Sequence, residues 1–355
     1  MENLNKRIAG RLKVFDDSFA KKILEKQFEA QPTLKEKYGE KQIHHYIEDT
    51  KFHLSYLAEA IINNESALFN EYLAWAKTFF ENLPVTDDEI IMNLELLRDE
   101  IASNLPEEMY NVTNKYINEG IEYYKTKSPV LPSFIKDENP QKEIAEKYLN
   151  FLIEGDKVSA HQLIMNAVQN GIPIKNLYLN VFQVSQQETG RLWQMSKISV
   201  AHEHFITAAT QLIMAQLYPY MFTSVNKDKR IIVSCIQGEL HEIGARMVAD
   251  IFEMEGWNSY YFGANTPIRS VIDSINKYNP QVLAISTTMT FNLSSVSDMI
   301  EKVRSEIASK DLKILVGGYP FIISEKLWQN IGADGFAPNA ISAVKLAEEL
   351  ITPEV

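Results

Sequence analysis

A histidine and a glutamate lie two residues apart in a loop that follows a predicted β-strand. The loop reads QGELHEIG over residues 237–244 and comes directly after the β-branched run RIIVSCI. An imidazole here can face a ligand or a metal, and the carboxylate of Glu239 can hold the second ring nitrogen of His241, which fixes its tautomer. Gly244 leaves space for a flat group at the start of the next helix. The alternative is a loop histidine beside a capping glutamate.

Two further predicted strands end in small or hydroxyl residues. The run QVLAIST leads into Ser286, Thr288 and Thr290, and the run KILVGG ends in Gly317 and Gly318. The carboxyl ends of parallel strands meet at one edge of a sheet, so these residues are expected beside His241 and to line a deep pocket. No GxGxxG motif is present, which argues against a plain dinucleotide site.

This pattern resembles the cobalamin-binding domain of methionine synthase, the mutases and the corrinoid carriers. Their D-x-H-x-x-G, S-x-L or S-x-T, and G-G motifs occur here as Glu239-x-His241-x-x-Gly244, Ser286-x-Thr288 and Gly317-Gly318. The resemblance implies base-off, His-on cobalamin with His241 as the cobalt ligand and the nucleotide tail in the slot beside Ser286. Glutamate at 239 in place of aspartate is typical of the light-sensing branch. The implied cofactor residues are Glu239, Leu240, His241, Glu242, Ile243, Gly244, Ser286, Thr288, Thr290, Gly317, Gly318 and Tyr319.

A second motif precedes this domain. Trp193 is predicted to end one helix, and Glu203 and His204 to begin the next, so that all three can face one cavity. The W-x9-E-H spacing resembles the adenosylcobalamin photoreceptors of the light-responsive repressor type. The resemblance implies that Trp193 shields the adenosyl group and that light breaks the Co–C bond and changes the oligomeric state. Gln194 replaces the histidine that follows the tryptophan in the repressors, which puts a bis-histidine photoproduct in doubt.

These motifs require a multi-domain α plus α/β architecture. Residues 1–228 hold six of the 14 glycines and show three- and four-residue apolar spacing, which predicts long helices. We expect a four-helix bundle over residues 141–228 that caps the upper cobalamin face. Alternating strands and helices over 229–355 predict a Rossmann-like, flavodoxin-type sheet of five parallel strands, the last a weak strand at GFAP.

The first 128 residues read as a separate helical domain, joined by a proline-containing linker at 129–140. Helices are predicted near residues 13–30, 40–63, 65–82, 86–104 and 107–127. One helix face carries a polar and aromatic stripe, which fits either a buried polar seam between helices or a pocket for a planar tetrapyrrole. The stripe residues are His45, Asp49, Phe52, His53 and Tyr56.

The stretch from Gln31 to Leu54 resembles a globin-like sensor module of bacterial stress-signalling proteins. Joined to the W-x9-E-H unit, it resembles the photocobilins, photoreceptors that carry both cobalamin and biliverdin. The domain has no cysteine, so biliverdin there would be non-covalent. Haem is the competing tetrapyrrole, with His53 or His45 as axial ligand.

Composition excludes several classes of function. The 355 residues include 35 Lys and Arg against 47 Asp and Glu, a net charge of −12, which disfavours nucleic-acid binding. No apolar run is long enough to span a membrane, and the amino terminus lacks the apolar core of a signal peptide. Cys235 is the single cysteine, so no intramolecular disulfide forms. We expect a cytoplasmic protein.

The main hypothesis is therefore a light sensor rather than an enzyme, binding adenosylcobalamin and biliverdin. It would signal through light-dependent self-association or a separate downstream partner. The alternatives are a corrinoid methyl carrier for a methyltransferase and a sensor of cobalamin availability. A mutase subunit is disfavoured because residues 1–228 lack the repeated strands of a substrate barrel.

Overall fold

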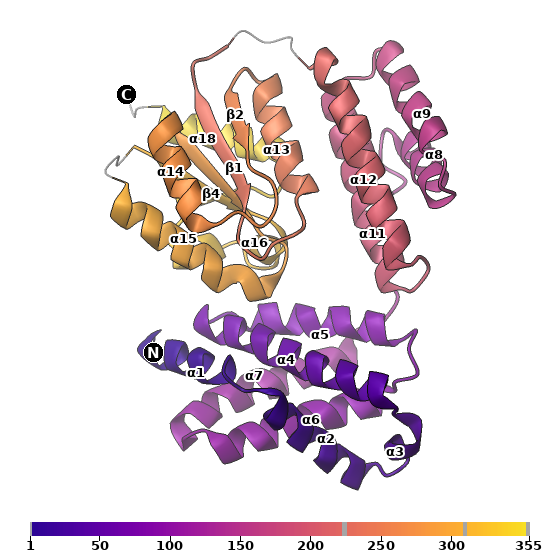
Figure 1. Ribbon diagram of the computed structural model, residues 1–355, viewed down its shortest axis with the longest axis vertical. Coiled ribbons are helices and arrows are strands. Elements are labelled where there is room, and N and C mark those ends of the chain that lie inside the picture. The colour runs from indigo at the N-terminus through magenta and orange to yellow at the C-terminus, as the bar shows by residue number, and fades with distance from the viewer. Residues whose placement is uncertain (1, 222–225, 308–310, 353–355) are drawn as a thin grey trace. The chain divides into compact units, whose positions relative to one another are not determined.

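The protein is described from a computed structural model that covers residues 2–221, 226–307 and 311–352. Its contacts divide the chain into unit 1, Met1–Pro129, and unit 2, Val130–Val355 (Figure 1). The division falls at the predicted proline-containing linker.

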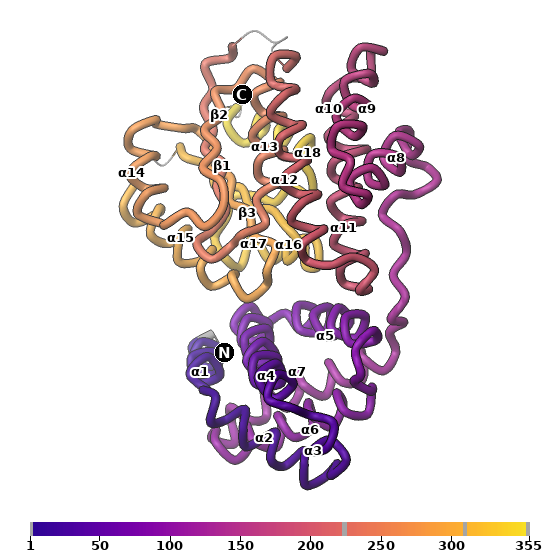
Figure 2. Tube along the Cα trace, turned by 45° about the vertical axis from the view of Figure 1, so that its right-hand side comes forward, coloured from indigo at the N-terminus to yellow at the C-terminus, as the bar shows by residue number. Residues whose placement is uncertain are grey.

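Unit 1 is helical throughout its described residues (Figure 2). The helices α1 and α4 pack together, as do α5 and α7, and α2 packs on both α4 and α6. The predicted helical domain is confirmed in this sense, whereas its globin-like identity stays a prediction. The helices are α1 (Glu2–Leu12), α2 (Asp17–Ala30), α3 (Leu34–Lys37), α4 (Glu40–Ile62), α5 (Ser66–Phe80), α6 (Asp87–Asn104) and α7 (Glu107–Thr126).

Side-chain caps explain where several of these helices start. Thr86 and Glu89 form a reciprocal capping box at the start of α6. The Asp16 carboxylate accepts hydrogen bonds from the backbone N–H groups of Ser18 and Phe19 and so begins α2. The predicted single helix from residue 13 is therefore wrong at its start. A separate helix, α1, ends at Leu12, and Asp16 caps the next one.

The first part of unit 2 consists of helices that pack on one another. The predicted helix at 174–195 contains a π-helical segment, η1, which continues directly into α11. Helices α8 and α12 contact each other, and each of them also contacts α9 and α11. The four-helix bundle expected over residues 141–228 stays a prediction. The elements are α8 (Lys142–Ile153), α9 (Lys157–Gln169), α10 (Ile174–Leu177), η1 (Tyr178–Gln183), α11 (Val184–Gln194), α12 (Val200–Leu217) and the 3-10 turn η2 (Tyr218–Tyr220).

The second part of unit 2 is a five-stranded, all-parallel sheet in the order β2-β1-β3-β4-β5, which confirms the predicted Rossmann-like fold. The helices α13 and α18 pack together on one side, and α14 and α15 on the other (Figure 1). The strands are β1 (Arg230–Cys235), β2 (Asn258–Tyr261), β3 (Val282–Ser286), β4 (Lys313–Gly317) and β5 (Gly335–Phe336). The helices are α13 (Ile243–Met254), α14 (Ile268–Tyr278), η3 (Thr290–Asn292), α15 (Leu293–Glu306), α16 (Tyr319–Ile323), α17 (Leu327–Asn330) and α18 (Ala340–Ile351).

One hydrophobic core runs through both parts of unit 2. It joins Tyr178 and Leu217 of the helical part to Ile231 of β1 and Phe252 of α13. The linker belongs to the same unit, because Ile135 is buried in this core. The segment is also bonded to α11: the N–H of Phe134 donates to the Glu188 carboxylate, and Arg191 donates to the carbonyl of Leu131.

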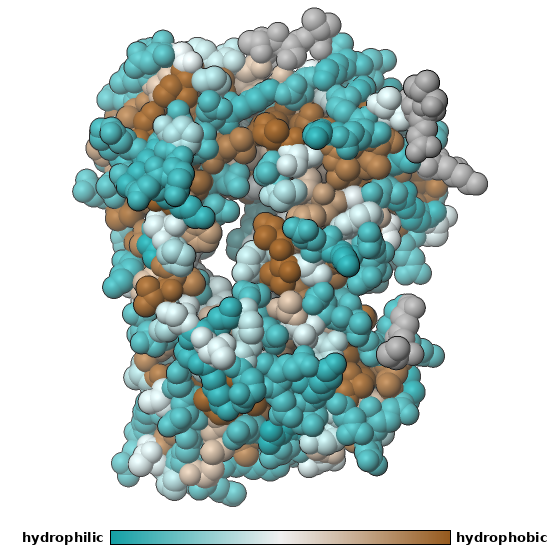
Figure 3. Space-filling view, turned by 180° about the vertical axis from the view of Figure 1, so that it is seen from behind, coloured by the Kyte–Doolittle hydropathy of each residue, from teal (hydrophilic) through white to brown (hydrophobic). Residues whose placement is uncertain are grey.

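Polar residues cover most of the face drawn in Figure 3, and apolar residues gather there only in small patches. Among the described helices, none combines the length and apolar character that crossing a bilayer demands.

Candidate functional site

The strand order places the predicted loops at a topological switch point. Strand β1 pairs with β2 on one side and with β3 on the other, so the order in which strands are added to this parallel sheet reverses between β1 and β3. In such sheets the crevice beyond the carboxyl ends of those two strands binds ligands. The loop with His241 follows β1, and the loop with Thr287 follows β3. The candidate site therefore lies where this fold opens a crevice.

Glu239 holds the imidazole of His241 in a fixed orientation. One carboxylate oxygen, Oε1, accepts from Nδ1 of His241 at 2.5 Å and from its backbone N–H at 3.0 Å. This bond sets the tautomer and directs Nε2 outward. The His241 side chain is 58% exposed, whereas that of Glu239 is fully buried, so the ring faces solvent on a buried support. The hydrogen bond to Glu239 raises the pKa of His241, although desolvation opposes it.

The other oxygen of Glu239 links β1 to the loop after β3. It accepts from the N–H groups of Thr288 and Met289 at 2.8 and 2.9 Å, from the Thr287 hydroxyl at 3.2 Å and from the Asn292 amide at 3.3 Å. Burial alone would raise the pKa of this carboxyl, but the hydrogen bonds from His241 and the Met289 N–H outweigh it and lower the pKa to about 2. Glu239 is therefore an anion that ties the two loops together.

Thr287 and Asn292 donate hydrogen bonds to Glu239, and the sequence motifs did not predict these two contacts. The motif suggested Ser286, Thr288 and Thr290, but the hydroxyl that reaches Glu239 belongs to Thr287. Side chains alternate along an extended strand, so the residue between two motif positions points to the opposite side. That alternation was the available signal for Thr287. Nothing in the sequence indicated Asn292.

The three glycines of the site differ in whether packing within the protein requires a glycine. Gly318 has φ +110°, and an added Cβ would lie 1.8 Å from the carbonyl oxygen of Thr287, so packing within the protein requires glycine there. At Gly317 the nearest atom would be a carbonyl oxygen at 3.5 Å, an ordinary contact. At Gly244 an added Cβ would meet nothing within 4 Å. The open space beside Gly244 is where a flat ligand could lie next to His241.

The helical part of unit 2 brings Glu203 close to the same loop. Trp193 lies in the last turn of α11 and Glu203 in the first turn of α12, as predicted. Trp193 is half-buried against the core, and Glu203 bonds to Nδ1 of His204 at 2.5 Å and to the Thr207 hydroxyl at 2.9 Å. The negative charge of Glu203 adds to the rise of the His241 pKa that Glu239 causes. The imidazole of His241 therefore lies within the electrostatic reach of α12.

The other predicted cofactor residues surround the loop in different environments. Leu240 and Tyr319 are exposed, Ile243 and Thr290 are buried, and Ser286 and Thr288 are half-buried. Glu242 directs its carboxylate to other protein groups: Gln211 of α12, Tyr261 of β2 and the N–H of Ala264.

The stripe predicted on unit 1 divides between core and surface. His53 and Tyr56 are buried, whereas His45 and Phe52 are exposed. Nδ1 of His53 bonds to the Tyr72 hydroxyl at 2.8 Å, and burial lowers the pKa of His53 to about 4. Asp49 is half-buried, and burial raises its pKa to about 6.

The His202-x-His204 pair forms no metal cluster. Within the described residues, no three His, Cys, Asp or Glu side chains lie close enough to hold a metal ion.

Two family models match unit 2. Residues 229–345 match one model of a B12 binding domain, and residues 144–218 match a second model with the same description. The matched ranges contain the sheet with His241 and the helices with Trp193 and Glu203. Residues 1–143 lie outside both models.

The chain is also similar to curated corrinoid proteins. Dimethylamine corrinoid protein 3 of Methanosarcina acetivorans is 26% identical over 193 residues, which are 53% of this chain and 89% of the relative. Dimethylamine corrinoid protein 3 of Methanosarcina mazei is 31% identical over 122 residues, 34% of this chain and 71% of the relative. Both relatives are named as corrinoid proteins.

A solved structure shares the fold. The monomethylamine corrinoid protein of Methanosarcina barkeri aligns with a TM-score of 0.53 at 22% identity, covering 59% of this chain and 99% of that one. The 31% identity with a corrinoid protein of which 71% is covered shows the family. The chain therefore belongs to the family of corrinoid proteins built from B12-binding domains.

Proposed function

We propose that this protein is a corrinoid carrier that holds cobalamin base-off with His241 as the lower cobalt ligand and exchanges a methyl group with a separate methyltransferase. The observation that carries the proposal is the exposed His241 ring, held by a buried, ionised Glu239 at the switch point of the sheet. The comparisons favour this function, which was the alternative hypothesis from sequence, over the light sensor. The dimethylamine and monomethylamine corrinoid proteins above support it by their names.

The residues present fit a corrinoid. Nε2 of His241 faces outward, and the space beside Gly244 is open. The tail slot would lie between the loop after β3, with Ser286, Thr288 and Thr290, and Gly317 at the end of β4. When bound, the cofactor supplies a cobalt centre that takes up and releases a methyl group.

The chain's own residues keep the lower ligand ready. The Glu239 carboxylate retains the proton of His241 on Nδ1, so the lone pair of Nε2 is free for the metal. The same carboxylate fixes the loop after β3 through four hydrogen bonds. The buried carboxylate of Glu239 thus holds both the candidate lower ligand and the loop that would line the tail slot.

A second candidate function is light sensing with adenosylcobalamin. The observation in its favour is the pair formed by Trp193 and Glu203, where an indole can cover a bulky upper ligand and a carboxylate can accept from ribose hydroxyls. In this case residues 1–128 would be the globin-like domain, with non-covalent biliverdin near His53, and photolysis would change self-association. No photoreceptor is among the relatives reported above.

Lower ligation is tested with cobalamin-loaded protein labelled with 15N-histidine. We expect the electron paramagnetic resonance of its Co(II) form to show splitting from the label in wild type and none in His241→Ala. An unchanged splitting in the variant would refute the His241 assignment.

Methyl carriage is tested by mixing the reduced, cobalamin-loaded protein with a methylamine:corrinoid methyltransferase and its methylamine. We expect the absorbance of methylcobalamin to appear on this protein. The light sensor predicts instead no methylation, together with an irreversible spectral change and altered sedimentation when the adenosylcobalamin form is illuminated. Trp193→Ala serves as the matched variant, since it should affect only the adenosyl form.

A further inference from the structure

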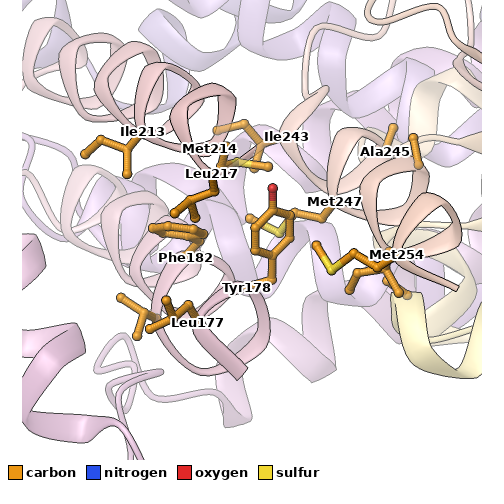
Figure 4. Packing of buried hydrophobic residues seen from close by; sticks show 14 of the residues in the cluster. Leu177, Tyr178, Phe182, Ile213, Met214, Leu217, Ile243, Ala245, Met247 and Met254 are labelled. Atoms are coloured by element: carbon orange, nitrogen blue, oxygen red, sulfur yellow. The ribbon is translucent and has the colours of Figure 1, made fainter. Parts of the chain in front are cut away.

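Side chains of α13 share one buried cluster with side chains of the helical part of unit 2. Figure 4 shows the Tyr178 ring beside Met247 of α13, with Met254 farther along the same helix. Methionine side chains are unbranched and adapt to changes in their surroundings. This apolar contact can therefore adjust without being lost.

The polar contacts of this interface lie at both ends of α13. Near its carboxyl end, the Tyr178 hydroxyl donates to Asp250 at 2.8 Å, the Tyr218 hydroxyl donates to Glu253 at 3.1 Å, and Lys175 pairs with Glu255. At the amino end, one bond reaches the residue that caps the helix, from the Gln211 amide to Oε1 of Glu242 at 2.8 Å. Because α13 has 12 residues, about 18 Å separates its two ends.

Glu242 is fixed to the sheet independently of Gln211. Its second oxygen accepts from the Tyr261 hydroxyl at 3.0 Å and from the N–H of Ala264 at 2.9 Å. Gly263 makes this approach possible, because an added Cβ there would lie 2.9 Å from the same oxygen. A displacement of α12 would therefore break the bond to Gln211 and leave the bonds to Tyr261 and Ala264 in place.

Gln211 shares a helix face with the acidic residue above the site. Glu203, Thr207 and Gln211 are spaced by four residues on α12, and Glu203 bonds to Thr207. Glu242, in turn, directly follows His241. One hydrogen bond therefore joins the helix that carries Glu203 to the loop that carries the candidate lower ligand.

We propose that Glu242 is a positioning residue and that its bond with Gln211 is a latch that holds α12 over His241. This inference rests on the proposed function and deepens it: opening the latch exposes the upper face to the partner enzyme, with the contacts at the carboxyl end of α13 as the pivot. The latch acts by hydrogen bonding alone, and Glu242 touches no reacting atom.

The test is a swap of the two groups in the full chain. In Gln211→Glu, two carboxylates face each other and the latch opens. In the double variant Gln211→Glu with Glu242→Gln, the amide and the carboxylate have exchanged places and the bond forms again. Tyr218→Phe is the matched control, because it removes one hydrogen bond at the pivot end.

The first readout is the rate at which azide replaces the upper ligand in hydroxocobalamin-loaded protein, followed by absorbance. We expect about a tenfold increase in Gln211→Glu, the size expected for losing a hydrogen bond to a charged group. The rates of the double variant and of the Tyr218→Phe control should both lie within about threefold of the wild-type rate. Equal rates in wild type and Gln211→Glu, or no rescue in the double variant, would overturn the latch.

The second readout needs no cofactor. Hydrogen exchange of α12 amides around Gln211 should accelerate in Gln211→Glu and recover in the double variant, whereas the Ala264 amide, which donates to the other oxygen of Glu242, should keep its rate. If wild type fails to bind cobalamin, the proposed function fails, whereas this exchange pattern still decides the latch. Unchanged exchange in all variants would overturn it.

Discussion

Replacing Glu239 by glutamine tests the most heavily bonded group of the site. The substitution keeps the size of the side chain but removes its charge and turns an amide toward donors. The two backbone N–H groups of Thr288 and Met289 and the Nδ1–H of His241 all need acceptors. At least one buried donor is then left without a partner.

The expected loss of stability in Glu239→Gln follows from the pKa of Glu239. Its fall from the ordinary 4.5 to about 2 means that the folded protein favours the ionised form by about 3 kcal/mol. This contribution is fully present above pH 4.5 and is lost as the pH falls toward 2. At pH 3 roughly half of this contribution should remain. We therefore expect Glu239→Gln to destabilise unit 2 by about 3 kcal/mol at pH 7 and by roughly half of that at pH 3.

The assay is urea unfolding of the cofactor-free chain, followed by hydrogen exchange so that the two units are read separately. Peptides of unit 2 should report the loss, and peptides of unit 1 should not change. Glu203→Gln is the control, because its half-exposed carboxylate should contribute less than about 1 kcal/mol. A loss below about 1 kcal/mol at pH 7, or a loss that stays the same at pH 3, would refute this account of Glu239.

Four further predictions concern other residues. Gly318→Ala should destabilise unit 2 by at least about 2 kcal/mol in thermal unfolding, because its Cβ would overlap a carbonyl oxygen. Gly244→Ala should leave the cofactor-free protein as stable or up to about 1 kcal/mol more stable, yet weaken cobalamin binding in a titration. Cys235, whose pKa burial raises to about 12, should react with a thiol reagent at pH 8 only after unfolding; labelling of the native protein would contradict this. In unit 1, the folded state disfavours protonation of His53 below pH 6.5 but favours protonation of Asp49 below pH 6, so the two effects oppose each other. Asp49→Asn removes the opposing effect of Asp49. The free energy of unfolding of unit 1 in this variant should therefore fall by about 3 kcal/mol between pH 7 and pH 4, as measured by hydrogen exchange, and a value that does not change with pH would contradict the role of His53.

Local patterns in the sequence determined the elements and the chemistry of the site. The β-branched runs RIIVSCI and QVLAIST predicted buried parallel strands, and both form them. Glu239 and His241 are two residues apart, so their hydrogen bond depends on a single loop and could be inferred. The start of α2 was missed although Asp16 and Ser18 form a local capping signal.

Tertiary structure decided the contacts between elements that are distant in the chain. Thr287 and Asn292 reach Glu239 because β3 pairs with β1, and strand order is set by how the helices pack on the sheet. The stripe on α4 was predicted to share one face, yet packing against Tyr72 buries His53 while His45 stays exposed. Gln211 meets Glu242 only because α12 docks beside α13, and sequence periodicity carries no information about which helices dock.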